Sequence, residues 1–547
     1  MISSDDEAEK RDVKAGPGLD APLSHPDPPS AWNFTDLELH EAQQPSDENA
    51  YLTLVYNNSP VGKVSMRMGN NRPYPPTMSD MTAYCVGFDG PDDPLNPLNW
   101  PMRKKIYNGF CLSFATFILT WDSSIYSVTV PMMEEIYHIG RVPAVLGISL
   151  YVMGFAVGPI IWGPISEIFG RKPPLVVSSI LFVIFNFWCA TASHYYELML
   201  YRFALGALGS APLATTAACF GDFLHYRVRG IGAAFFGLCV MGGPSVGPAV
   251  GGFITYSFLG WRWTSYISGI MASLSLVMML FLSESYHPVV LAHKARVLRQ
   301  ETGNPFIYAE HDHAQVHIKA IFQKVLLTPI RMIFQEPILL LVSLYHGFVY
   351  GILYMFLEGV PLIFAQYHWP DQLISLPYMA VFVGSAITCA ANILYFDRLF
   401  RKRLAKTDLS IVPEYRLPLM IFGGVIFPIG LFWMCWTGAY APHVHWIAPL
   451  LGLTATGIGL MAIFNPIFSY IVDTYRFRAA SAIAANTFIR SAMGASFPLF
   501  ANAMFKNLGI QWAGTLLGCL AVLLAPIPVL FYRHGHRIRA CSKYAPT

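Results

Sequence analysis

Charged residues are scarce in this chain of 547 residues. Aspartate, glutamate, lysine and arginine make up 13% of it, whereas hydrophobic residues make up 54%. An average soluble domain has about 25% charged residues, so the composition excludes an ordinary soluble protein and is typical of a membrane protein. The formal net charge is only +3. Because neither sign of charge dominates, nucleic acid is not an expected partner.

Signatures of catalysis and of metal binding are missing as well. The nine cysteines lie mostly in apolar runs and form no CxxC pair, which predicts buried thiols and no metal site. The sequence has no phosphate-binding loop of the GxxxxGKS or GxxxxGKT type, so ATP is not expected to power this chain. No HExxH or GxSxG signature stands in a catalytic context. We therefore expect neither an enzyme nor a cofactor.

Twelve stretches are long and apolar enough to cross a membrane, which takes a helix of about 20 residues. They are residues 107–128, 144–165, 174–194, 199–221, 230–255, 262–282, 338–366, 374–396, 417–437, 444–470, 480–504 and 511–532. A longer polar loop separates the first six from the last six. We therefore predict an all-α membrane protein with twelve transmembrane helices in two six-helix halves.

The spans divide the chain into five predicted parts: a tail (1–100), a first half (101–285), a central loop (286–336), a second half (337–535) and a C-terminal tail (536–547). The first tail is rich in proline, aspartate and serine and lacks a helical apolar period, which predicts disorder. Basic residues gather at one side of the spans, and only Arg141 and Lys506 lie in the opposite loops. The positive-inside rule then predicts that both termini and the central loop are cytoplasmic.

One charge pattern occurs once in each predicted half. An acid, an arginine four residues later and an adjacent lysine recur as Glu167, Arg171 and Lys172 and as Asp397, Arg401 and Lys402. Both copies follow the second span of their half, which indicates a parallel repeat with a cavity between pseudo-symmetric halves. The first copy, GPISEIFGRKPPL (163–175), resembles the cytoplasmic signature of the major facilitator superfamily. Glu167 and Ile168 stand where that signature usually has aspartate and arginine.

Five further stretches are similar to signatures of that superfamily, and especially of its fungal twelve-span drug:proton antiporters. They are DPLNPLNWP (93–101), LMLYRFALGALG (198–209), GGPSVGPAVGG (242–252), SESYHPVVLAHKARVLRQETG (283–303) and NTFIRSAMGASFPLFANAMFKNLGIQWAGTLLG (486–518). The resemblance extends over about residues 90–545. It implies the major facilitator fold, a monomer in the lipid of a fungal plasma membrane, and a small-molecule substrate exchanged for protons.

Two groups of residues are predicted to control movement of the halves. The gating motif consists of Gly163, Glu167, Gly170, Arg171, Lys172, Asp397, Arg401 and Lys402. In it, Glu167 is expected to pair with Arg171 or with the facing half and to hold a cytoplasmic gate closed; the alternative is simple anchoring of the loop. The antiporter motif consists of Gly243, Pro244, Gly247, Pro248, Gly251 and Gly252. It predicts a kinked helix packed tightly between the halves, and generic small-residue packing is the alternative.

Three charged residues within or near spans are candidates for proton coupling: Asp122, Arg202 and Glu358. A charge inside the membrane is costly and usually functional, and a carboxylate there can load and release a proton near neutral pH. By the resemblance, Arg202 tunes a neighbouring carboxylate. The alternatives are that Arg202 reaches interfacial water and that Glu358 lies at the outer interface. For Asp122 the alternative is a local hydrogen bond to Ser123 or Ser124.

Seven residues are candidates for the substrate cavity: Tyr126, His346, Tyr350, Tyr354, Asn465, Asn486 and Arg490. His346, Tyr350 and Tyr354 are spaced four residues apart and therefore share one helix face. Aromatic rings suit flat or cationic apolar ligands. The alternatives are a packing histidine, hydrogen bonds between helices, and aromatic belts at the membrane surface.

These features together predict a proton-coupled exporter that works by alternating access. Proton entry from outside would neutralise a cavity acid and expel the substrate. Candidate substrates are drug-like or other small organic compounds, including toxins, fungal secondary metabolites and polyamines. An importer or facilitator of a small organic solute, and a membrane sensor that transports nothing, are the alternatives.

Overall fold

The computed structural model describes residues 67–69, 84–225, 228–313, 328–405, 412–441, 443–475, 479–540 and 542. The chain divides into two compact units, Met1–Gly87 with Lys294–Tyr308 and Phe88–His293 with Ala309–Thr547. In the smaller unit a parallel β-bridge joins Cys85 to Tyr308. Most of the predicted tail 1–100 lies outside the described residues.

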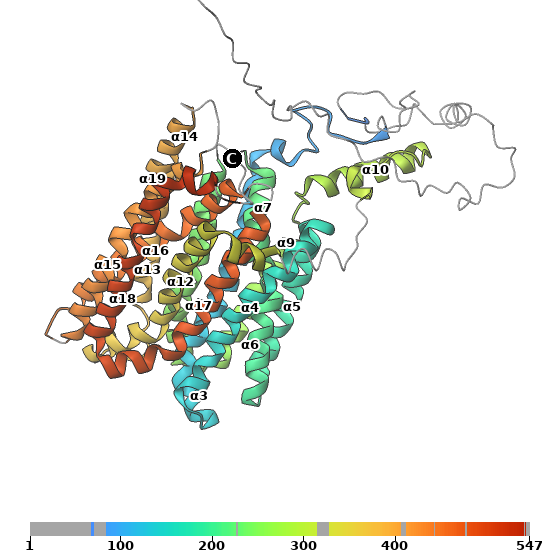
Figure 1. The fold of residues 1–547 in the computed structure, drawn as a ribbon. Helices are drawn as coiled ribbons and strands as arrows, with labels where there is room; N and C mark the ends of the chain where they lie inside the picture. The colour runs from blue at the N-terminus through green and yellow to red at the C-terminus, as the bar shows by residue number, and fades with distance from the viewer. Residues whose placement is uncertain are drawn as a thin grey trace, which may run out of the picture. The chain divides into compact units, whose positions relative to one another are not determined.

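The larger unit is helical throughout its described core (Figure 1). The first half consists of α2 (Met102–Ile125), α3 (Val130–Tyr137), α4 (Arg141–Ile168), α5 (Lys172–Thr191), α6 (Tyr195–Gly209), α7 (Ala211–Phe223), α8 (Arg229–Thr255) and α9 (Arg262–Leu280). Helices α6 and α7 together form the fourth predicted span and meet at Ser210. Helix α10 (His287–Thr302) follows in the predicted central loop.

The second half repeats this arrangement. It consists of α12 (Pro337–Phe364), α13 (Tyr378–Ala391), α14 (Asp397–Ala405), α15 (Leu417–Ala439), α16 (Ile447–Thr474), α17 (Ala479–Leu508), α18 (Ile510–Leu524) and α19 (Pro526–Ala540). Within the described ranges, 10 helical segments are long and apolar enough to cross a membrane. Helices α2 and α17 occupy the two predicted spans that remain. Helix α19 continues into residues that we assigned to the C-terminal tail.

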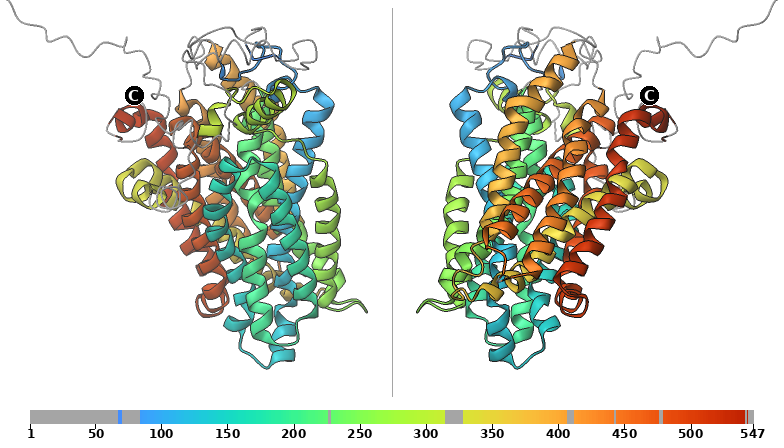
Figure 2. Two further views of the ribbon diagram at one scale, coloured as in Figure 1. Left: turned by 90° about the vertical axis from the view of Figure 1, so that its right-hand side faces the viewer. Right: turned by 90° about the vertical axis from the view of Figure 1, so that its left-hand side faces the viewer.

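The two halves pack by the same rules. Helix α2 packs on α8 as α12 packs on α17, α4 packs on α6 as α13 packs on α16, and α5 packs on α9 as α15 packs on α18. Between the halves, α4 packs on α17 and α8 packs on α13. The helices of both halves run side by side in all views (Figure 2). The predicted twelve-helix fold with two halves is therefore confirmed.

Glycines at matching positions bring equivalent helices together. A Cβ atom on Gly154 of α4 would collide with the backbone of Gly206 and Ala207 on α6. A Cβ atom on Gly384 of α13 would collide with the backbone of Thr454 and Ile458 on α16. Close backbone approach at small residues drives helix association in lipid. Gly154 and Gly384 are separated by the same 230 positions as Glu167 and Asp397, so the repeat extends from the loops into the helix packing.

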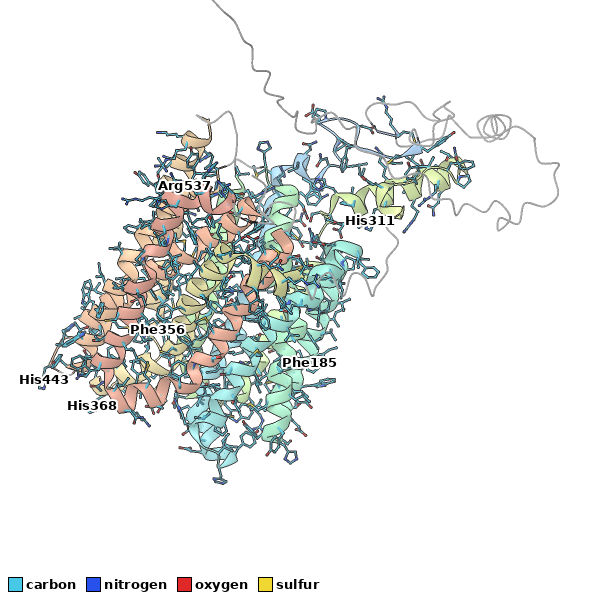
Figure 3. All side chains as sticks on the ribbon, in the orientation of Figure 1. Phe185, His311, Phe356, His368, His443 and Arg537 are labelled. Atoms are coloured by element: carbon cyan, nitrogen blue, oxygen red, sulfur yellow. The ribbon has the colours of Figure 1, made fainter. Side chains whose placement is uncertain are left out.

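The two ends of the helices differ in charge. Arg537 of α19 lies at the end that carries the basic loops, whereas His368 and His443 lie at the opposite end (Figure 3). Between these ends the side chains are packed and apolar, and Phe356 on α12, for example, is 1% exposed. We call the two ends the basic end and the α3 end, after the short helix α3 at the second one.

Candidate functional site

A cavity of about 260 Å³ lies between the halves. Most of its lining comes from α4, α7 and α8 of the first half and from α16 and α17 of the second, and Arg171 and Arg416 line it from just before α5 and α15. Five charged side chains surround it toward the basic end: Glu167, Arg171, Arg229, Arg416 and Asp473. Phe236, Phe468 and several alanines form its apolar part. Among the residues that the sequence predicted, Gly163, Glu167, Arg171 and Asn465 line this cavity.

Arg171 of the first gating motif pairs with an unexpected residue. Its Nε lies 3.1 Å from Oδ2 of Asp222 at the end of α7, and its Nη1 donates to Ser166 at 2.9 Å. The expected Glu167–Arg171 pair is wrong, because Glu167 forms no ion pair within the described part of the chain. The physical reason is that α4 ends at Ile168, so Arg171 is not one helical turn beyond Glu167.

A second acid that the sequence did not reveal orders the same loop. The carboxylate of Glu284 accepts the backbone N–H groups of Arg171 and Lys172, each at 2.9 Å. Gly170 has a φ of 90°, a backbone conformation that glycine adopts without a steric penalty, and a Cβ atom there would lie 2.6 Å from Glu284 Oε2. Glu284 therefore ties the gating loop to the segment after α9.

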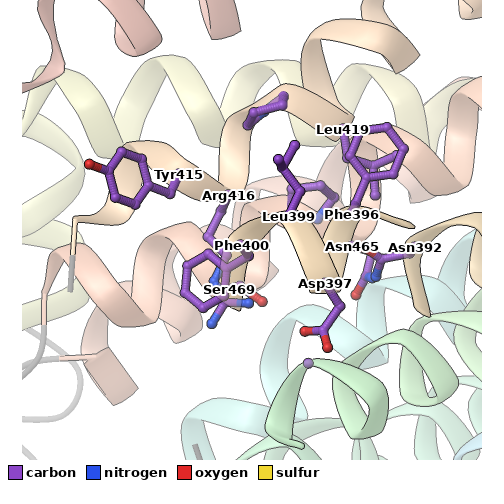
Figure 4. A pocket seen from close by; sticks show the side chains of 13 residues that line it. Asn392, Phe396, Asp397, Leu399, Phe400, Tyr415, Arg416, Leu419, Asn465 and Ser469 are labelled. Carbon is purple, nitrogen blue, oxygen red and sulfur yellow. The ribbon is translucent and has the colours of Figure 1, made fainter. Parts of the chain in front are cut away.

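The second gating motif is arranged differently. Asp397 begins α14, and its Oδ2 lies 3.1 Å from Nε of Arg401 one turn later in the same helix. Asp397 also points at the start of α8, where a Cβ atom on Gly230 would collide with its carboxylate (Figure 4). A carboxylate is stabilised at a helix N-terminus by the helix dipole. The acid of the second half is thereby joined to a helix of the first. Lys402 is exposed.

The antiporter motif makes a helix contact with α2. A Cβ atom on Gly243 would collide with Thr120, and one on Gly247 would collide with Ser124. Gly251 faces Ile125 in the same way. Helix α8 continues through Pro244 and Pro248, and a Cβ atom on Gly252 would lie 2.9 Å from the carbonyl oxygen of Gln372 in the second half. The motif thus packs α8 closely against its own half on one face and against the other half on another.

Asp122 and Arg202 lie together in the first half. Nη1 of Arg202 is 3.6 Å from Oδ2 of Asp122, and both residues are 1% exposed. The guanidinium also donates to the backbone carbonyls of Asp122, Ser123 and Gly147 at 2.9, 3.2 and 3.1 Å. The rings of Tyr126 and Tyr151 lie 4.8 and 4.4 Å from its central carbon. Arg202 does not reach interfacial water; it is held by four polar partners and two rings.

Glu358 joins the halves at the α3 end. Nη2 and Nε of Arg141 lie 2.7 and 3.1 Å from Glu358 Oε2, and Nη1 of Arg141 lies 3.1 Å from Oε1 of Glu134 on α3. The Glu358 side chain is fully buried, whereas that of Arg141 is 31% exposed. The sequence marked Arg141 only as one of two basic residues in the loops at the α3 end. Its pairing with Glu358 was not predicted, because the two residues are 217 positions apart in the chain.

Polar side chains lie along one face of α12, and its two tyrosines form a short chain of hydroxyls that crosses to α2. His346 Nδ1 and Asn486 Oδ1 are 2.8 Å apart. The hydroxyls of Tyr350 and Tyr354 are 3.4 Å apart, and the Tyr354 hydroxyl is 2.8 Å from Oγ of Ser123. The predicted shared face of α12 is thus present, and its far end touches the residue next to Asp122. All five side chains are buried.

Arg490 of α17 lies beside this chain without a polar partner. It is fully buried, and none of its three guanidinium nitrogens has a hydrogen bond among the residues that the structure describes. The rings of Tyr350, Phe464 and Phe468 surround its central carbon at 4.5, 5.3 and 5.7 Å. Neither phenylalanine was a sequence candidate, because aromatic residues are frequent in every predicted span.

Comparisons with known proteins agree with this fold. The model of the Major Facilitator Superfamily matches residues 112–498. The major facilitator superfamily multidrug transporter FLU1 of Candida albicans is 46% identical over 481 residues, covering 87% of this chain and 79% of that protein. The multidrug transporter TPO1_2 of Candida glabrata is 45% identical over 479 residues, covering 87% and 82%. The solved xylose transporter XylE from E. coli, in a partially occluded inward open conformation, shares the fold with a TM-score of 0.55 at 18% identity, covering 78% of this chain and 98% of that one.

Proposed function

The chain belongs to the major facilitator superfamily of multi-pass membrane transporters, and we propose that it exports drug-like or other small organic compounds in exchange for protons. The observation that carries the proposal is a cavity between two halves that an ion pair joins at one end. Relatives that share nearly half of its residues are named multidrug transporters. A sensor that transports nothing is disfavoured, because two repeated halves with a cavity between them suit alternating access.

The proposed orientation puts the basic end in the cytoplasm, as the positive-inside rule favours. The cavity then takes up its substrate from the cytoplasm, while the pair of Arg141 and Glu358 closes the outer end. The site of action is the plasma membrane, the chain works as a monomer, and both termini are cytoplasmic. An epitope at either terminus should become accessible to antibody only after the cells are permeabilised.

Two carboxylates have separate roles in the proposed cycle. A proton that enters from outside neutralises Glu358, which removes the charge that holds Arg141 and allows the outer end to open. A proton on Asp122 removes its attraction for Arg202 and alters the segment of α2 that Ser123 joins to Tyr354. Because only a difference in affinity between two states can drive a conformational change, proton binding and substrate binding must favour opposite states.

Transport by the purified chain in liposomes tests the proposal. The uncharged dye Nile red should accumulate when a pH gradient is applied and should stop accumulating when a protonophore collapses that gradient. Asp122→Asn should abolish accumulation while it preserves exchange of labelled for unlabelled dye, because exchange needs no net proton movement. Dye that only equilibrates across the membrane, at a rate indifferent to the pH gradient, would indicate a facilitator. Movement of no dye or drug at all would leave only the sensor.

A further inference from the structure

The second half contains a buried cation that the proton cycle does not use. Arg490 has no hydrogen bond from any guanidinium nitrogen, and within the described ranges no carboxylate forms an ion pair with it. Arg202, equally buried, makes three hydrogen bonds to carbonyls and has Asp122 beside it. An unpaired buried charge is strongly unfavourable, so the contrast points to a partner that is not part of the chain.

The chemistry around Arg490 favours one kind of partner. Aromatic rings attract a guanidinium to their faces, and Tyr350, Phe464 and Phe468 supply this attraction. Rings do not satisfy N–H donors, which lie in the plane of the guanidinium as a rigid fork. A carboxylate matches that fork with two parallel hydrogen bonds. A cation in the same place would be repelled.

Arg490 also lies next to the cavity. Ile483 and Thr487 of α17 line the cavity. Arg490 comes three residues after Thr487 and therefore lies on the same face of α17. Phe468 lines the cavity as well and lies against Arg490 on its other side. Phe468 therefore belongs both to the lining of the cavity and to the surroundings of the guanidinium.

We infer that Arg490 binds the carboxylate of amphipathic organic acids whose apolar part occupies the cavity. The inference rests on the proposed function and specifies its substrate class. It favours organic anions over polyamines among the candidate substrates. The apolar body of the ligand contacts Phe236 and Phe468 in the cavity, and the carboxylate provides the missing partner of the guanidinium.

Three probes that share one ring system test this inference with the full purified chain in detergent. They are 1-naphthoate, which is ionised at neutral pH, the neutral 1-naphthamide, and the cationic 1-naphthylmethylammonium, each radiolabelled for equilibrium binding. The dissociation constant of naphthoate from the wild-type protein should be at least about tenfold lower than that of naphthamide. The reason is that a buried, charge-assisted hydrogen-bonded pair changes a dissociation constant by about this factor or more. The cation should bind least. Equal binding of naphthoate and naphthamide would overturn the inference.

Variants separate the role of the guanidinium from that of the cavity. Arg490→Met should lower naphthoate binding to the level of naphthamide and leave naphthamide binding unchanged, whereas Arg490→Lys should keep part of the preference because it keeps the charge and loses the fork. Arg262→Met, which removes an exposed arginine of α9, should keep the full preference. An unchanged preference in Arg490→Met would refute the inference. If Arg490→Met does not elute as a folded monomer in size-exclusion chromatography, the inference is tested by the preference for naphthoate over naphthamide in the wild type and in Arg490→Lys.

Transport distinguishes failure of this inference from failure of the proposed function. If wild-type liposomes export the uncharged dye Nile red with a pH gradient but the wild-type protein shows no preference for naphthoate over naphthamide, the chain is a proton-coupled exporter and the anion site is wrong. If naphthoate binds through Arg490 but no compound moves, the site is real and the exporter function is wrong.

Discussion

Neutralising Glu358 should open the α3 end of the protein. Its carboxylate is fully buried and is held by Arg141 through two contacts of 2.7 and 3.1 Å. Glu358 lies on α12 of the second half and Arg141 on α4 of the first. Glu358→Gln keeps the shape and one weaker hydrogen bond but removes the charge, so the variant weakens an attraction that exists only while this end is closed.

The size of the effect follows from the exposure of the two partners. A fully exposed ion pair contributes about 0–1 kcal/mol, whereas breaking a fully buried one costs about 3–5 kcal/mol. Here one partner is fully buried and the other is 31% exposed. An intermediate loss of about 1–3 kcal/mol corresponds to a change of about 5–150-fold in the ratio of closed to open molecules.

Distances between spin labels across the α3 end measure this ratio. Labels at Ile136 on α3 and Lys506 on α17, both exposed, report on one half each. The Glu358→Gln variant should show a larger population at long distance than the wild type. Glu134→Gln is the matched control, because Glu134 also contacts Arg141 but belongs to the same half and is partly exposed. Equal distance distributions in wild type and Glu358→Gln, or an equal shift in the control, would show that the pair does not close this end.

Three further predictions test other contacts by thermal unfolding and dye export. Asp222→Asn should destabilise the protein by about 1–3 kcal/mol, because it leaves the buried Arg171 without its counter-charge. Glu167→Gln should change stability by less than about 0.5 kcal/mol. A larger loss of stability in Glu167→Gln than in Asp222→Asn would contradict the pairing of Arg171 with Asp222. Gly243→Val should lower stability by about 1–3 kcal/mol and reduce export, because the larger side chain overpacks the contact with α2. Gly163→Ala should be tolerated, because a Cβ atom on Gly163 meets open space. Equal stability and export of the two variants would argue against close packing of α8 on α2. Tyr354→Phe should cost about 0.5–1.5 kcal/mol through loss of its bond to α2, and an unchanged melting temperature would show that this bond contributes nothing.

Helix positions could be predicted from the sequence because they depend on local composition. The predicted span 144–165 lies inside α4 (Arg141–Ile168), and 338–366 nearly coincides with α12 (Pro337–Phe364). The requirement that every backbone group in lipid be satisfied within a helix makes apolar length a reliable signal. The repeat was visible for the same reason, since its two copies share local spacing.

The partners of individual charges could not be predicted in this way. Arg171 pairs with Asp222, 51 positions away, because the helix that carries Glu167 ends before Arg171 is reached. Glu358 finds Arg141 only when α4 and α12 are packed in one bundle. Local spacing carries no information about such pairs, and in the second copy, where α14 is continuous from Asp397 to Arg401, local spacing was sufficient.

The two buried arginines, Arg202 and Arg490, suggest different roles for the two halves in the proposed cycle. Arg202 has its donors occupied by carbonyls of α2 and α4, so its place is fixed and only the charge of Asp122 can change beside it. Arg490 has its donors free for a ligand, and its neighbour Tyr350 is joined through Tyr354 to Ser123. A carboxylate bound to Arg490 would therefore act on the same short chain of hydroxyls as a proton bound to Asp122, but from the opposite half. The competition that we propose between proton and substrate then needs no long pathway, because only Tyr350, Tyr354 and Ser123 separate the two proposed sites.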